Sequence, residues 1–474
     1  MANKLGGLAA SLLVAATATV SPASAESPSP SPIDPRSVKE SIAYLAATYG
    51  VNEREALRRL ELQRGAAELD KWLRRVVPDQ YGGMWIDQKA GGVLVVSLTD
   101  PTAAQKDIAA SPVHSQVQVR TVKYSLAALN SASDRISAQV GAGPESVYLP
   151  VVSPTENRVV VWERSWLKKN KAAAGVEAVP EARVFDADSG KVATRVLQKP
   201  TPYAADPVDK GYCHPLFCTN HGPMRGGLRL DLTRDNGTVG GCTSGFNLRT
   251  TGGAFPNVPW VLTAGHCMAT KTNNVPTQHN TQAVLNQHGI EKNAYPYDYA
   301  AVRYVDAPTA DRWLESQTAR NLVLKHCGEG GTCDPASPSG NQEITKITPL
   351  AEVITGSIVC ASGSGSSAVT YPEAVDSGAG EGYVVGTKCG QVLSTDVGIN
   401  TDVCARAGDS GGPLFDQTDK AALGILEGSQ QSRSGPCQPG ELNNYSPIST
   451  ILEDLSARQA SGGSVFTVIT TPQG

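Results

Sequence analysis

The distribution of cysteine is the feature that most constrains this chain. All ten cysteines lie at or after Cys213, and the residues before it contain none. An even number of cysteines gathered in one part of a chain is typical of a disulfide-linked domain in an oxidising compartment. The sequence therefore predicts two regions of different character, of which only the second depends on disulfides.

The first 25 residues have the pattern of a secretory signal peptide. Lys4 is followed by an uncharged, apolar run over residues 5–20, and Ala23-Ser24-Ala25 provides small residues for cleavage. A membrane anchor is the alternative, but a span needs about 20 apolar residues and Pro22 follows the run. We therefore expect residues 1–25 to be removed and the protein to be secreted, extracellular and free of the membrane.

Charge also differs between the two regions. Residues 26–205 carry 20 acidic and 23 basic residues, whereas residues 206–474 carry 25 acidic and 17 basic residues, a net charge of −8. The whole chain has a net charge of −4. Because no basic excess is available to neutralise phosphates, we expect no nucleic-acid partner.

Local patterns divide the mature chain into four segments. Residues 26–36 are a Ser/Pro linker, and residues 37–197 have the helix and hairpin patterns of a small α+β domain with a repeated unit. The proline-rich residues 198–221 are a second linker. Residues 222–474 contain many short apolar runs between turn residues, which predicts an all-β domain with a terminal helix near Ile448–Leu455.

The second region contains a serine on a glycine-rich turn, Gly408-Asp409-Ser410-Gly411-Gly412-Pro413. Such a turn can expose a nucleophile, but Gly-x-Ser-x-Gly also occurs in α/β-hydrolases, where the catalytic histidine follows the serine. No histidine follows His326, which disfavours an esterase of that fold. Residues 263–267, Thr-Ala-Gly-His-Cys, and residues 297–302, Tyr-Asp-Tyr-Ala-Ala-Val, instead give the order His, Asp, Ser.

With these motifs, residues from about 222 to 455 resemble secreted bacterial serine peptidases of the chymotrypsin/trypsin family. The first region resembles the pro-regions of the alpha-lytic protease group. That resemblance rests on Gly82–Asp87, Val93–Val96 and Asn157–Val161.

The resemblance implies an all-β, double six-stranded β-barrel domain preceded by the small α+β pro-domain. It further implies a serine endopeptidase, made as a pro-enzyme, that acts through an acyl-enzyme. Ser410 would be the nucleophile, His266 the base and Asp298 its orienting partner, with the N–H groups of Gly408 and Ser410 forming the oxyanion hole. The implied partners are protein or peptide substrates and the chain's own pro-region, as folding aid and inhibitor; we expect a monomer with no cofactor and no metal.

Other residues compete for these roles. The histidines that could replace His266 are His279, His288 and His326, and Asp306 and Asp311 compete with Asp298. A chymotrypsin-fold protein that binds partners without catalysis is the alternative function.

The family pattern also suggests how the cysteines pair. The implied bridges are Cys242–Cys267, Cys360–Cys389, Cys404–Cys437, Cys213–Cys218 and Cys327–Cys333. A zinc site using His214, His221 and His326 is the alternative for the last four cysteines.

Two further features concern specificity and activation. Asp402, two residues before Cys404, suggests a preference for Arg or Lys at the P1 position, and Glu427, Gly428 and Ser429 stand where the family lines its substrate cleft. The chain has no Ile-Val-Gly-Gly terminus to pair with Asp409. We therefore expect an internal partner for Asp409 and activation by a cut between residues 198 and 225.

Overall fold

The computed structural model describes residues 32–141, 146–173, 190–203, 223–253, 256–269, 272–314, 321–325, 340–365, 379–380, 383–431 and 433–470. Residues 33–474 form one contact unit. The predicted signal peptide and the predicted bridges Cys213–Cys218 and Cys327–Cys333 lie outside the described residues. No helix among the described residues is long and apolar enough to cross a membrane.

The predicted pro-region, residues 37–197, begins with two helices, one ended and the other started by a residue suited to that position. Helix α1 (Lys39–Tyr49) ends at Gly50, which has a left-handed φ of 66°. Helix α2 (Glu53–Val76) begins after Asn52, whose side chain accepts a hydrogen bond from the Glu55 N–H. The apolar side of α2 packs against the first sheet through Leu62, Ala66, Leu69 and Leu73.

Two similar three-stranded sheets follow. In each, a hairpin is extended by a third strand parallel to its second strand. The first sheet contains β1 (Tyr81–Asp87), β2 (Val93–Leu98) and β3 (Val117–Thr121); the second contains β4 (Tyr148–Ser153), β5 (Arg158–Glu163) and β6 (Val192–Val196). The accompanying helices are α3 (Gln105–Ala110), α4 (Leu126–Val140) and α5 (Ser165–Ala173). The repeated α+β unit expected from the sequence is therefore present.

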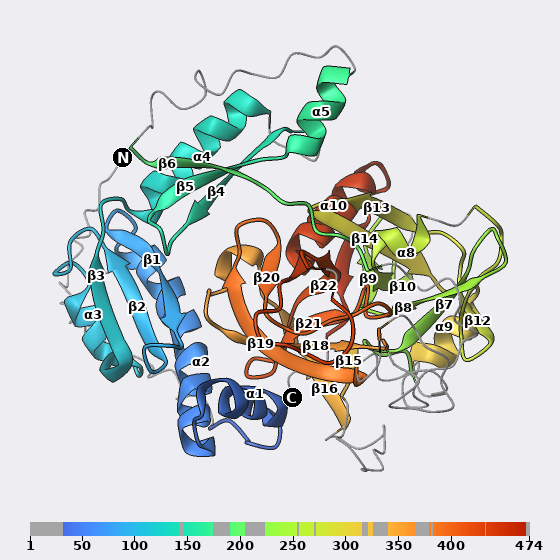
Figure 1. Ribbon diagram of the computed structural model, residues 1–474, viewed down its shortest axis with the longest axis horizontal. Helices are drawn as coiled ribbons and strands as arrows, with labels where there is room; N and C mark the ends of the chain where they lie inside the picture. Colours follow the sequence, from blue (N-terminus) through green and yellow to red (C-terminus); the bar gives the residue numbers. More distant parts are fainter. Residues whose placement is uncertain are drawn as a thin grey trace, which may run out of the picture. The chain divides into compact units, whose positions relative to one another are not determined.

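The first half of the protease region consists of two sheets joined by a bridge between Leu285 and Tyr304. Their strand orders are β12-β11-β7-β8 and β13-β14-β10-β9-β24, so this half has more strands than the six expected. The strands are β7 (Arg229–Thr233), β8 (Val239–Thr243), β9 (Asn247–Thr251), β10 (Pro259–Thr263), β11 (Thr277–His279), β12 (Gln282–Leu285), β13 (Ile290–Ala294), β14 (Tyr297–Arg303) and β24 (Val465–Val468). Figure 1 shows β7 to β14 in green and yellow.

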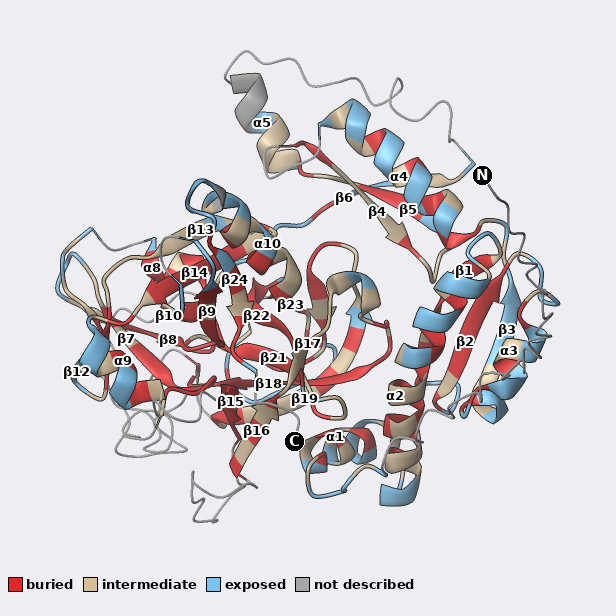
Figure 2. Ribbon diagram, turned by 180° about the vertical axis from the view of Figure 1, so that it is seen from behind, coloured by how far each residue is buried: buried red, intermediate tan, exposed pale blue. Residues whose placement is uncertain are grey.

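The second half is a closed six-stranded barrel. Its order is β22-β21-β18-β19-β20-β23, and pairing of β22 with β23 closes it. The strands are β18 (Ile358–Gly363), β19 (Gly386–Ser394), β20 (Ile399–Thr401), β21 (Pro413–Asp416), β22 (Ala421–Ser429) and β23 (Asn443–Pro447); β17 (Lys346–Ile347) adds to β22, and β15 (Asn321–Leu324) pairs with β16 (Asn341–Ile344). Figure 2 shows that buried residues concentrate on the strands of this barrel. Closure leaves no barrel edge unpaired.

Three α-helices lie among the described residues of the protease region. They are α8 (Gly265–Met268), α9 (Ala307–Leu314) and α10 (Ile448–Arg458). The terminal helix was expected, whereas α9 was not, because its eight residues, of which Ala310 and Trp313 are buried, are shorter than the windows in which helical periodicity is recognised.

Candidate active site

Three side chains from distant parts of the sequence form a hydrogen-bonded chain. His266 lies in α8, Asp298 in β14, and Ser410 in the turn before β21. The His266 Nδ1 atom is 2.5 Å from the Asp298 Oδ2 atom, and the His266 Nε2 atom is 2.8 Å from the Ser410 Oγ atom. This arrangement links a hydroxyl, an imidazole and a carboxylate in the order that nucleophilic catalysis requires.

Hydrogen bonds of the backbone fix the position of the carboxylate relative to the imidazole. The His266 N–H donates to the second Asp298 oxygen at 2.8 Å, and the Asp298 N–H donates to the Ser446 hydroxyl at 3.2 Å. Gly265 must be a glycine, since a Cβ atom there would lie 2.1 Å from the Lys292 carbonyl oxygen. The motif around His266 therefore brings α8 against β13 and orients the histidine.

The turn around Ser410 is fixed by hydrogen bonds to neighbouring strands. The Thr243 N–H donates to the Ser410 carbonyl at 2.8 Å, and Gly411 N–H donates to the Leu426 carbonyl at 2.9 Å. Gly408 has a φ of 94°, which favours glycine. Among the hydrogen bonds between described residues, none uses the N–H of Gly408 or Ser410. The oxyanion hole that the sequence analysis predicted would use these two donors.

Asp409 has internal partners. Its carboxylate accepts hydrogen bonds from the Gly365 N–H at 2.8 Å, from the Arg406 N–H at 2.9 Å and from the Tyr383 hydroxyl. Burial and the nearby Asp409 raise the pKa of Tyr383, so this phenol stays a donor. Asp409 therefore needs no newly formed N-terminus to compensate its charge.

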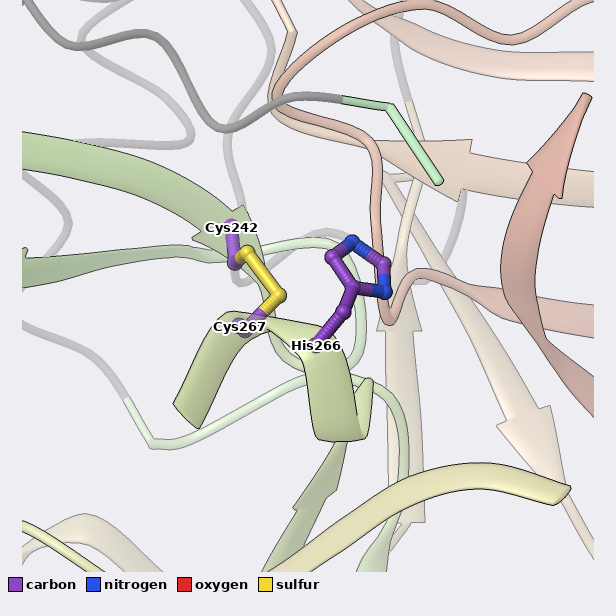
Figure 3. A group of neighbouring side chains, drawn as sticks. All are labelled: Cys242, His266 and Cys267. Carbon is purple, nitrogen blue, oxygen red and sulfur yellow. A yellow bond between two sulfur atoms is a disulfide. The ribbon is translucent and has the colours of Figure 1, made fainter. Parts of the chain in front are cut away.

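Three of the expected cysteine pairs form disulfides. Cys242–Cys267 lies beside His266, as Figure 3 shows; the other two are Cys360–Cys389, between β18 and β19, and Cys404–Cys437. His266, Cys242 and Cys267 are close enough to suggest a metal site. However, both sulfur atoms are used in the disulfide and cannot act as thiolate ligands.

The residues expected to bind substrate lie in different surroundings. The Asp402 carboxylate accepts hydrogen bonds from the Gln391 N–H at 2.5 Å and from the Tyr44 hydroxyl of α1 at 2.8 Å. Burial raises the pKa of Asp402. Asp402 therefore contacts the pro-region, and its carboxylate is engaged on both oxygens.

Glu427 is buried at the end of β22 close to the candidate triad. It accepts a 3.4 Å hydrogen bond from the Ser446 hydroxyl, which also binds the Asp298 N–H. Burial, followed by repulsion from Asp298, raises the pKa of Glu427 well above its usual range. Gly428 and Ser429 follow it, and both contact Thr201 of the preceding linker.

The competing histidines have other partners. His279 is buried with its Nδ1 atom 2.7 Å from the Arg229 carbonyl, and His288 lies 2.9 Å from Glu291. His326 lies outside the described residues. Of the described histidines, His266 is therefore the one that contacts Ser410.

The sequence analysis missed the contacts that the segment 200–203 makes with the second barrel and its loops. Thr201 pairs with Ser429, and the Tyr203 hydroxyl donates to Ala405 and Asn443. The alternating sequence Pro200-Thr201-Pro202-Tyr203 could have suggested an extended segment, because proline disfavours helix at and before its position.

Comparisons with known proteins match two families. Residues 239–452 match the trypsin family, and residues 54–110 match the family described as alpha-lytic protease pro N-terminal.

Curated relatives are similar at low identity. Streptogrisin-D of Streptomyces griseus is 26% identical over 217 residues, which cover 46% of this chain and 44% of the relative. Serine protease 1 of Rarobacter faecitabidus is 24% identical over 424 residues, covering 87% of this chain and 62% of the relative. The chain thus spans about half the length of these relatives.

Solved structures include a Nocardiopsis protease, NAPase, with 19% identity, a TM-score of 0.31, and coverage of 52% of this chain and 100% of that protein. Chymotrypsin of Cellulomonas bogoriensis has 23% identity and a TM-score of 0.29, covering 52% of this chain and 98% of that protein.

On the two family matches, the chain contains a trypsin-family domain at residues 239–452, preceded by an alpha-lytic protease pro N-terminal domain at residues 54–110.

Proposed function

We propose that this chain is the precursor of a secreted serine endopeptidase. The observation that carries the proposal is the continuous hydrogen-bonded chain from Ser410 through His266 to Asp298. The trypsin-family match and the pro-region match agree with a serine endopeptidase made as a zymogen. The signal-like residues 1–25 favour secretion.

In the proposed reaction, the Ser410 Oγ atom attacks the substrate carbonyl while the His266 Nε2 atom accepts its proton. The Gly408 and Ser410 N–H groups stabilise the oxyanion. His266 then returns the proton to the leaving amine, and an acyl-enzyme forms on Ser410. Water, activated by the same histidine, hydrolyses the ester.

The surroundings of Asp298 support its role as the anionic partner. It is nearly fully buried, and its two oxygens accept from the ring and the backbone of one residue, His266. Burial, followed by repulsion from Asp298, raises the pKa of Glu427 and so favours the neutral form of this neighbour. A neutral Glu427 avoids placing two negative charges beside the imidazole.

The proposed preference for Arg or Lys at P1 depended on a free carboxylate at Asp402. In the precursor, Tyr44 of the pro-region and Gln391 occupy that carboxylate, so the geometry of this state gives the preference no support. The following subsection argues for a different P1 residue.

A phosphonofluoridate tests the proposed chemistry directly. The processed protein should form a stoichiometric adduct that peptide mass mapping assigns to Ser410, and the full-length Ser410→Ala variant should form none. Absence of an adduct on a folded, processed protein would instead favour the catalytically silent binding protein.

A further inference from the structure

A short segment before the protease region is bound like an added β-strand. The Thr201 N–H donates to the Ser429 carbonyl at 2.8 Å, and the Ser429 N–H donates to the Thr201 carbonyl at 3.0 Å. This antiparallel bridge joins the linker to the last residue of β22. Extended peptides bind sheet edges through such main-chain hydrogen bonds.

The sequence around Thr201 suits this strand. Only alternate residues of an added strand hydrogen-bond to their neighbour, so Pro200 and Pro202 on either side of Thr201 lose no ladder bond. Gly428 allows the close approach, since a Cβ atom there would lie 2.5 Å from the Thr201 oxygen and 3.1 Å from the Pro202 Cα atom. The glycine and the prolines thus fit one extended backbone.

Tyr203 fills a pocket two residues further on. It is only 5% exposed, and its hydroxyl lies 2.6 Å from the Ala405 carbonyl oxygen and 2.7 Å from the Asn443 Oδ1 atom. The Asn443 Nδ2 atom donates to the Val403 carbonyl at 2.6 Å, which turns its oxygen toward the phenol. The base of the pocket therefore presents two acceptors to one hydroxyl proton.

Among the described residues around Tyr203, no carboxylate is free to pair with a cationic side chain. The nearby Glu441 forms a buried ion pair with Arg406 at 2.8 Å, and both side chains are at most 2% exposed. A lysine or arginine in place of Tyr203 would bury a positive charge that has no free carboxylate to pair with. Burying an unpaired charge costs free energy. An uncharged hydrogen-bond donor with the length of a tyrosine side chain fits these surroundings better.

The strand places Tyr203 in the buried cluster that contains Leu426. Continuing the antiparallel register from the Thr201–Ser429 bridge by two residues would set Tyr203 opposite Glu427, next to Leu426. Leu426 exchanges backbone hydrogen bonds with Gly411 and Gly412, the two residues after Ser410. Ser410 itself is 1% exposed in this state.

We propose that Tyr203 is the P1 residue of the bond that the chain cuts to release its pro-region, and that the mature enzyme prefers tyrosine at P1. This inference rests on the proposed serine endopeptidase activity. Ser410 would attack the Tyr203 carbonyl, the C–N bond to Ala204 would break, and the amine of Ala204 would leave with a proton from His266. Water then releases Tyr203 as a carboxylate. The bond lies within the interval of residues 198–225 expected for maturation.

The first test locates the cut in the full-length chain. Intact mass and N-terminal sequencing should identify Ala204 as the first residue of the earliest mature species, and Ser410→Ala should remain uncut. Tyr203→Phe should still be cut there, whereas Tyr203→Asp should lose at least tenfold in the rate at this bond, because a charge would enter the pocket. An unchanged rate for Tyr203→Asp, or an earliest cut elsewhere, would overturn the proposal.

The second test measures the P1 selectivity of the pocket separately from the catalytic activity. On mature enzyme, Thr-Pro-Tyr p-nitroanilide should be cleaved more efficiently than its Phe analogue, and far more efficiently than those ending in Arg or Lys. Asn443→Leu should lower the Tyr-over-Phe ratio of kcat/KM by about tenfold, since one hydroxyl acceptor is lost. Faster cleavage after Arg or Lys would overturn the P1 assignment but would still agree with the proposed endopeptidase activity. If the protein neither hydrolysed these peptides nor formed a phosphonofluoridate adduct, the proposed function itself would be contradicted.

Discussion

Two of the contacts between the residues before Ala204 and the protease region differ in their chemistry. Helices α1 and α2 form a helical contact with the second barrel, whereas Thr201 and Tyr203 form a cleft contact with β22 and its pocket. The helical contact depends on side chains, and it includes no member of the candidate triad. The cleft contact depends on backbone pairing and one aromatic residue, and its strand β22 also hydrogen-bonds, through Leu426, to the two residues that follow Ser410.

The helical contact satisfies buried polar groups on both sides. The Gln63 amide donates to the Ile358 carbonyl at 3.0 Å and accepts from the Ile358 N–H at 2.6 Å. The Ser41 hydroxyl donates to Gln417 at 2.6 Å. Because these groups lie far from the bond after Tyr203 in the sequence and on other elements, cutting that bond removes none of these hydrogen bonds. We therefore expect a cut pro-region to stay bound through the helical contact.

The largest effect is expected from Ser410→Ala. Removal of the nucleophile should lower kcat by about a million-fold and leave the chain uncut after Tyr203. Both contacts should persist in this variant, because the serine hydroxyl contributes to neither. Intact mass spectrometry and peptide hydrolysis measure this, and processing at a normal rate would rule out Ser410 as the nucleophile.

Asp298→Asn should have the next largest effect. An amide at this position favours the wrong tautomer of His266, and in comparable triads the cost in kcat is about ten thousand-fold. Stability to thermal unfolding should change far less than activity, as measured by calorimetry in parallel. The matched control is Asp311→Asn, which changes an exposed aspartate of α9 and should leave kcat unaltered.

Gln63→Ala should weaken the helical contact without affecting the cleft contact. It leaves the Ile358 N–H and carbonyl buried without these partners, at a cost of about 1–3 kcal/mol. After cutting, the pro-region should dissociate from the mature protease about 10- to 100-fold more readily in gel filtration or calorimetry. Lys106→Ala, at an exposed site in α3, is the control. An unchanged affinity in Gln63→Ala would show that the helical contact does not hold the cut pro-region.

The smallest effect concerns Glu427 beside the cleft. Its folded-state pKa is raised, so it is protonated in the fold at pH values where it would be ionised in the unfolded chain. Any stability that it contributes is fully present below its unfolded pKa and is lost as pH rises through the folded pKa. Glu427→Gln cannot ionise, and its free energy of unfolding should therefore exceed that of the parent by more at pH 8 than at pH 4.

This difference is measured by denaturant unfolding in a Ser410→Ala background, which prevents self-digestion. Glu53→Gln, at an exposed helix start, should show no comparable trend. If the difference between parent and Glu427→Gln stays constant with pH, the raised pKa of Glu427 is excluded.

Short-range features were predictable from the sequence by itself. The C-terminal end of α1 and the start of α2 follow from Gly50 and Asn52, because capping involves residues within one turn. The family motifs around His266, Asp298 and Ser410 identified a candidate triad, and the hydrogen bonds among these residues agree with that expectation.

Only the tertiary structure decided how distant side chains pair. Asp402 was expected to bind substrate because of its spacing from Cys404, yet its carboxylate is satisfied by Tyr44, more than 350 residues away in sequence. The pairing of Thr201 with Ser429 and the fit of Tyr203 against Asn443 likewise join segments that no local pattern relates. Spacing along the chain determines which residues share a turn or a strand, but packing between remote elements determines which partner each buried polar group obtains.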